Sequence, residues 1–120
     1  MATVTPRLLS GSTNGRGIFI ASATAASGTL LHTSVSGTGV NTFDEVYLYA
    51  MNLTTVARKL VLNAGGTTSG DKVRFTVPSS SGGLFLLLPG TRYNGAVTIR
   101  GYATSASKAL AVHGYVNRSA

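Results

Sequence analysis

Alternation of apolar and polar residues with a period of two is the feature that most restricts how this chain can fold. In residues 44–53, for example, Val46 and Leu48 alternate with Tyr47 and Tyr49. Successive side chains of a β-strand point to opposite faces, so this pattern indicates a strand with one buried face.

About eight runs of this kind follow one another at a spacing of roughly 10–12 residues, with turn residues such as Gly, Asn and Ser between them. The pattern predicts an all-β chain: a single antiparallel β-sandwich, jelly-roll-like, of about eight strands, over residues 17–120. Residues 1–16 are rich in Thr, Ser and Gly and are predicted to form an extended N-terminal arm outside the core.

The inward-facing side chains of these strands are expected to form the core. They are Phe19, Leu31, Val46, Leu48, Leu60, Leu62, Val73, Phe75, Phe85, Val97, Ile99, Leu110 and Val112. Residues 84–88 are apolar on both faces, which predicts a central strand or an interface. Residues 89–90 (Pro-Gly) are expected to form a turn, and Asn94-Gly95 is the strongest hairpin signal in the chain.

Charged residues are scarce. They make up 11% of the chain, against about 25% in an ordinary globular domain. A soluble monomer normally carries more charge on its surface. We therefore expect much of the surface to be covered by other protein chains, as in a homo-oligomeric component of a larger assembly.

The balance of charge is basic, with ten Lys and Arg residues against three acids and a formal net charge of +7. This excess favours an acidic partner, either a protein face or nucleic acid. Lys72 and Arg74 share one strand face, as do Arg100 and Tyr102, which could suit nucleic acid. The chain has no RNP-type aromatic motif, and Tyr and Arg are also typical of protein interfaces. Nucleic acid is therefore the less favoured partner.

Residues that could support catalysis or metal binding are few. The chain has no cysteine, two histidines (His32 and His113) and three acids (Asp44, Glu45 and Asp71), and it lacks a Gly-x-Ser-x-Gly motif. We expect no catalytic site, no metal site and no cofactor, so the chain is not predicted to be an enzyme. No apolar run reaches the length needed to span a bilayer, and the start does not resemble a signal peptide. No membrane partner is expected, and synthesis in the cytoplasm is predicted.

Three stretches, residues 32–50, 89–103 and 113–118, resemble small β-rich virion proteins of tailed bacteriophages, of the capsid decoration or cement type. The resemblance implies a structural protein on the capsid surface of the virion. It would bind the major capsid protein on the outside of an assembled head and stabilise the shell, commonly as a trimer. The alternatives are another virion component, such as a tail or host-attachment module, and a nucleic-acid-binding β-domain.

Two groups of residues are predicted to contact the capsid or a neighbouring protomer. The first lies on the N-terminal arm and consists of Arg7, Leu8, Leu9 and Arg16. The second faces away from the predicted core and combines aromatic area with hydrogen-bond donors, as residues central to interfaces do. It consists of Tyr47, Tyr49, Arg100, Tyr102 and Tyr115.

Overall fold

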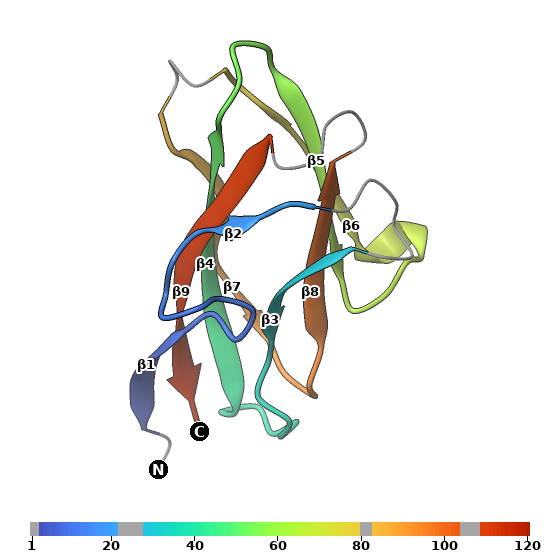
Figure 1. Ribbon diagram of the computed structural model, residues 1–120. Coiled ribbons are helices and arrows are strands. Elements are labelled where there is room, and N and C mark those ends of the chain that lie inside the picture. Colours follow the sequence, from blue (N-terminus) through green and yellow to red (C-terminus); the bar gives the residue numbers. More distant parts are fainter. Residues whose placement is uncertain (1–2, 22–27, 80–82, 104–108) are drawn as a thin grey trace.

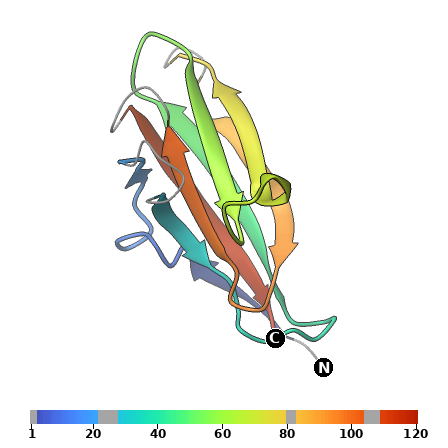
Figure 2. The same cartoon turned by 90° about the vertical axis from the view of Figure 1, so that its right-hand side faces the viewer.

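A computed structural model describes residues 3–21, 28–79, 83–103 and 109–120, which form two antiparallel sheets facing each other (Figures 1 and 2). The strands are β1 (Val4–Leu8), β2 (Ile18–Phe19), β3 (Thr29–Thr33), β4 (Phe43–Asn52), β5 (Arg58–Ala64), β6 (Lys72–Val77), β7 (Phe85–Tyr93), β8 (Thr98–Ala103) and β9 (Leu110–Ser119). A short 3-10 helix, η2 (Ser69–Asp71), precedes β6. The molecule is elongated, with extents of 47 × 28 × 21 Å.

The order of the strands defines the winding of the chain. The five-stranded sheet has the order β1-β9-β4-β7, and the short β2 also pairs with β9; the four-stranded sheet has the order β3-β8-β5-β6. Apart from β2, β1 therefore pairs with β9, β3 with β8, β4 with β7 and β5 with β6. These pairs are nested like one long antiparallel hairpin rolled into two facing sheets, which is a jelly roll. The prediction of a single antiparallel, jelly-roll-like β-sandwich is confirmed.

The core lies between the two sheets and comes from the inward face of each strand. Along β4, buried and half-buried residues alternate without a break from Phe43 to Asn52. Eight of the predicted core residues are fully buried: Leu31, Val46, Leu48, Leu60, Leu62, Ile99, Leu110 and Val112. Phe75 and Phe85 are half-buried and pack against this core in an edge-to-face pair whose ring centroids lie 6.2 Å apart. Val97 is also half-buried.

Two predicted core residues are exposed. Phe19 is 51% exposed, because its neighbours Ile18 and Ile20 point into the core instead. Residues 18–20 are all apolar, so either Phe19 or the pair Ile18 and Ile20 could face inward, because a shift of one residue exchanges the two faces of a strand. Val73 is 36% exposed. It lies near the beginning of the edge strand β6, whereas Val77 at the other end of that strand is fully buried.

The strand β7 differs from its prediction in two ways. It continues through Pro89 and Gly90, where a turn was expected, and it lies at the edge of its sheet. Of the two predicted alternatives, the central strand is therefore wrong, and the interface stays a prediction. An edge strand tolerates proline because one side of it needs no backbone donors. Gly90 has a φ of +99°, and the register of β7 against β4 shifts nearby, so the strand absorbs the irregularity as a bulge.

The described part of the predicted N-terminal arm belongs to the sandwich. Strand β1 pairs with β9 in register from Val4↔Ser119 to Leu8↔Tyr115. Leu9 follows β1 and is a core residue, 3% exposed. The prediction that Leu9 contacts a neighbouring chain is therefore wrong, because the edge of β9 gives the segment a partner within its own chain. The backbone N–H of Gly11 also donates to the carbonyl of Leu31, 3.0 Å away.

Candidate interaction surfaces

A buried polar cluster joins three strands at one end of the sandwich. Nε2 of His32 lies 2.7 Å from Oδ2 of Asp44. Arg118 donates to the same carboxylate through both Nε (2.7 Å to Oδ1) and a terminal nitrogen (2.9 Å to Oδ2). The backbone N–H of Val35 donates to Oδ2 at 3.1 Å. Because Asp44 is fully buried, these four donors replace the water that its charge has lost.

The electrostatics of the cluster favour an ionised Asp44. Burial by itself raises the pKa of the Asp44 carboxyl, but hydrogen bonds and charge from Arg118 and His32 outweigh it and lower the pKa below its ordinary value. The same carboxylate raises the pKa of Arg118. The cluster thus links β3, β4 and β9 through the Arg118–Asp44 ion pair and the His32–Asp44 hydrogen bond.

The His32–Asp44 pair superficially resembles part of a hydrolase triad, but its surroundings do not match one. The second ring nitrogen of His32, Nδ1, accepts a hydrogen bond from the backbone N–H of Ser10 at 3.0 Å. The hydroxyl oxygen of Ser10 instead accepts from the backbone N–H of Thr33 at 2.7 Å. A triad needs the imidazole to hold the serine hydroxyl and to be open to substrate. Here the His32 side chain is 2% exposed, and its Nδ1 accepts from the backbone of Ser10 instead of from a serine hydroxyl. The cluster therefore fixes the N-terminal segment against β3.

The outer face of the five-stranded sheet carries aromatic and aliphatic side chains. Tyr47 and Tyr115 are cross-strand neighbours whose rings stack with centroids 4.7 Å apart and planes 13° apart. Leu8, 60% exposed, lies opposite Tyr115 on β1. On the other side Gly90 lies under the Tyr47 ring, where an added Cβ would come within 2.9 Å of the ring. One apolar row therefore crosses β7, β4, β9 and β1.

A second row extends this surface towards β2. Tyr49 lies opposite His113, and Gly17 approaches the His113 ring so closely that an added Cβ would lie 2.5 Å from it. Phe19 projects from β2 beside this row, at the rim of a depression of about 610 Å³ that Arg16 also lines. We call the combined surface the aromatic face. It comprises Leu8, Phe19, Tyr47, Tyr49, Leu86 and Tyr115.

The outer face of this sheet carries an ion pair at one end. Arg92 pairs with Glu45 (Nε to Oε2, 3.0 Å) and lies over the ring of Phe43 with its guanidinium carbon 4.5 Å from the centroid. Glu45 and Arg92 are cross-strand neighbours on β4 and β7, near the end where β4 begins. The six residues of the aromatic face lie further along the same strands and carry no charge, and Arg16 lies beside them at the depression near Phe19.

The outer face of the four-stranded sheet is basic. Lys59 is exposed on β5, Arg74 is exposed on β6 opposite Val61, and Tyr102 lies on the other side of Val61 on β8. One row further along, Arg100 and Lys72 flank Asn63. We call this surface the basic face. It comprises Lys59, Lys72, Arg74, Arg100 and Tyr102.

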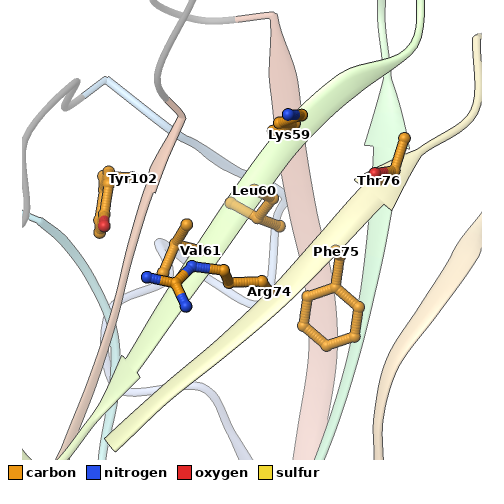
Figure 3. Close-up of a pocket in the computed structure, with 7 residues that line it drawn as sticks. All are labelled: Lys59, Leu60, Val61, Arg74, Phe75, Thr76 and Tyr102. Carbon is orange, nitrogen blue, oxygen red and sulfur yellow. The ribbon is translucent and has the colours of Figure 1, made fainter. Parts of the chain in front are cut away.

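Several side chains of the basic face are held in place. Lys72 donates from Nζ to Oδ1 of Asn63 at 3.0 Å, and its ammonium lies 5.4 Å from the centroid of the Tyr102 ring. Arg100 donates to the carbonyl of Gly28 at 3.1 Å. Figure 3 shows Arg74 extending across Val61 on the side of Tyr102, whereas Phe75 points away. A depression of about 470 Å³ lies here, lined by Lys59, Leu60, Val61, Arg74, Phe75, Thr76 and Tyr102.

The structure divides the outward-facing group of predicted interface residues between the two sheets. Tyr47, Tyr49 and Tyr115 lie on the aromatic face, and Leu8 from the N-terminal segment joins them. Arg100 and Tyr102 lie on the opposite side of the sandwich. Arg7 is exposed and alternates with Leu8 on β1, so the two side chains leave the strand in opposite directions. Arg16 lies at the depression beside Phe19.

Sequence reasoning missed some members of both faces. Phe19 was assigned to the core, and Leu86 was recognised only as part of an apolar run. The flanking residues Ile18 and Ile20 were the available signal, because they offer an alternative inward pair around Phe19. Lys59 was missed although it precedes Leu60 in an alternating run, which places it outward.

Comparisons with protein-family models, with curated proteins and with solved structures found no match. Within the described ranges, no helix is long and apolar enough to cross a membrane. The same residues hold no group of three or more His, Cys, Asp or Glu side chains that could bind a metal ion. We therefore base the proposal for function on the geometry of the two faces.

Proposed function

We propose that this protein is a structural component of a virion, of the decoration type. It binds the outer surface of an assembled viral capsid, assembles as a homotrimer, stabilises the shell and performs no catalysis. The observation that carries the proposal is the aromatic face, because a sandwich this small rarely leaves so much aromatic and aliphatic surface in water unless another protein covers it. The jelly roll is also used by viral capsid proteins, which supports the proposal by analogy of fold.

The aromatic face suits contact between copies of the chain. Each copy carries a net charge of +7, so two copies repel one another except where the touching surfaces are uncharged. The aromatic face meets this condition. A stacked pair of tyrosines with phenylalanine and leucine nearby, bordered by charged residues, resembles the core and rim of an oligomer interface.

Small size and repetition suit the proposed role. A protein that binds assembled subunits better than free ones stabilises the assembled shell by mass action. Three linked protomers that engage the shell together bind far more tightly than one, since the second and third contacts form at high effective concentration. A chain of 120 residues can supply both effects with one sandwich.

Two measurements test this proposal. Light scattering at micromolar concentration should give three times the chain mass of 12.3 kDa, and a monomer would contradict self-association in solution. Addition of the protein to DNA-emptied heads of the virus that encodes it should give stoichiometric, symmetric decoration. If the protein does not bind the heads, the capsid role is wrong, and a role in the tail or in host attachment is the next hypothesis to test.

A nucleic-acid-binding β-domain is the second candidate, favoured by the cations and Tyr102 of the basic face. Phosphate contacts would give DNA binding that weakens steeply as salt rises. A capsid-binding protein should show little affinity for duplex DNA at physiological salt. Titration with a labelled duplex at two salt concentrations separates these two candidates.

A further inference from the structure

We infer that the basic face is the surface through which this protein docks on its partner, and that it fits an acidic protein surface on the capsid. This inference rests on the proposed function and deepens it. It assigns the contact to the four-stranded sheet and gives the chemistry of the partner.

The distribution of charge is the first argument. Four of the ten basic residues, Lys59, Lys72, Arg74 and Arg100, project from three adjacent strands of one sheet. Of the three acidic residues of the chain, Asp44 is buried and Glu45 is on β4. Asp71 in η2 directly precedes Lys72, and its carboxylate accepts a hydrogen bond from the Thr68 hydroxyl. The strand residues of the basic face are thus of one sign, which attracts a surface of the opposite sign.

The form of the patch is the second argument. Its depression has an apolar floor at Val61 and an aromatic wall at Tyr102, with Lys59 and Arg74 at the border (Figure 3). A guanidinium beside apolar and aromatic surface binds a carboxylate in a defined direction and excludes water from the contact. An acidic side chain carried on a protein surface supplies both the carboxylate and the apolar stem for such a site.

The third argument excludes a second copy of this chain as the occupant. Two basic faces would bring eight positive charges together. The aromatic face of another copy offers no excess of acid to balance them, since Glu45 is already paired with Arg92. The two faces lie on opposite outer sides of the sandwich, so self-association through one leaves the other free.

The fourth argument separates an acidic protein from nucleic acid. A sheet that binds single strands uses aromatic rings whose faces are free to stack on successive bases. Among the strand residues of this face, Tyr102 supplies the aromatic ring, and the ammonium of Lys72 already occupies one side of it. Lys72 and Arg100 are both tethered by hydrogen bonds. Cations ordered in this way suit a rigid partner with carboxylates at fixed positions.

The test compares two double variants that each lower the net charge by two. Lys59→Gln/Arg74→Gln removes two exposed cations of the basic face, and Thr38→Glu/Thr55→Glu adds two acids at exposed loop positions that belong to neither face. The probes are DNA-emptied heads of the encoding virus, stripped of this protein, and a 20-base-pair duplex DNA, both at about 150 mM salt. Circular dichroism and thermal melts establish that each variant is folded.

We expect the wild type to decorate the heads, the Lys59→Gln/Arg74→Gln variant to bind them about tenfold more weakly, and the control variant to stay within about twofold. If the first variant binds like the wild type, the inference is wrong while the capsid role stands. Equal weakening of both variants would show that net charge alone matters and would also overturn it. If the wild-type protein does not bind the heads, the proposed function is wrong, and so is the capsid as the partner of the basic face. Duplex binding tighter than head binding, lost in the first variant, would make the face a nucleic-acid site instead.

Discussion

The two outer faces of this sandwich are built by the same alternation of residues and yet differ in every property that matters for binding. The aromatic face presents stacked tyrosines and exposed leucines across β7, β4, β9 and β1. The basic face presents four cations across β8, β5 and β6. A period of two places a residue outside without deciding its chemistry. One small domain can therefore carry one surface suited to copies of itself and another suited to a different, acidic partner.

The largest effect is expected between the two faces, in the buried cluster that holds the sheets together. Asp44→Ala leaves Arg118 and His32 without their shared carboxylate. Loss of one member of a buried ionic pair costs about 3–5 kcal/mol. Urea unfolding followed by circular dichroism measures this change in the free energy of unfolding.

The adjacent Glu45 is the matched control for that substitution. Glu45→Gln breaks a pair whose partner, Arg92, is 64% exposed, so the cost should stay below about 1 kcal/mol. Similar costs for the two variants would show that the cluster is no more important to stability than a surface pair.

The next effect tests the aromatic face. Leu8→Glu/Phe19→Glu places two carboxylates among apolar groups that are 60% and 51% exposed in one copy. The fold should survive, because neither side chain is part of the core. Self-association should weaken by about 30-fold or more, as expected when residues central to an interface are lost. Sedimentation of the variant measures the change.

Val40→Glu/Val56→Glu is the control for that variant. Both valines are exposed, at 91% and 57%, and lie off the aromatic face. The change in net charge is the same. If this control dissociates the oligomer equally, the aromatic face is not the contact between protomers, and the contrast between the two faces breaks down.

A smaller effect is the dependence of stability on pH, which tests the role of Asp44 in the wild-type protein. The folded-state pKa of Asp44 is lowered relative to its ordinary value of 3.8. The unfolded chain therefore binds this proton more readily, so the contribution of Asp44 to stability is fully present above that value. It is lost as the pH falls through the lower, folded pKa. The free energy of unfolding should decline in acid for the wild type, and this decline should be shallower in Asp44→Ala. Parallel curves would contradict the role assigned to Asp44.

The smallest expected effect is that of salt, which should act on one face only. Ionic contacts at a surface weaken as the Debye length shrinks from about 10 Å at 0.1 M to about 3 Å at 1 M salt. Binding to heads through the basic face should therefore fall several-fold between about 0.1 and 0.5 M salt. Self-association through uncharged groups should hold or strengthen. Parallel salt titrations of both reactions check this, and a common response would mean that one face serves both contacts.

Much of the fold could be predicted from the sequence, because a strand with one buried face alternates apolar and polar residues. Val46, Leu48 and Ile99 were placed correctly for this reason. The same reasoning failed at Phe19, where apolar neighbours allow either register. It also failed at Asn94-Gly95. A turn is present there, with φ of +68° at Gly95 and +57° at Ala96, but it joins β7 to β8 in the opposite sheet and closes no hairpin.

The candidate interaction surfaces were predictable only in part. Tyr47, Tyr49 and Tyr115 were recognised as outward residues, and so were Arg100 and Tyr102. Their division between two faces depends on which strands pair, and pairing depends on contacts between residues far apart in the chain. Leu9 shows the same limit. The sequence around Leu9 predicts a free arm, and only the pairing of β1 with the edge of β9 shows otherwise.

The sequence by itself therefore determined the class of fold, the approximate strands and which side chains of each strand face out, since these follow from local periodicity. Only the tertiary structure decided the jelly-roll winding, the capture of the N-terminal segment and the ionic cluster of His32, Asp44 and Arg118. It also sorted the outward residues into an aromatic and a basic face. Each of these depends on contacts between residues that are distant in sequence. Such contacts are set by how the strands pair and the sheets pack, and no periodic pattern in the sequence predicts them.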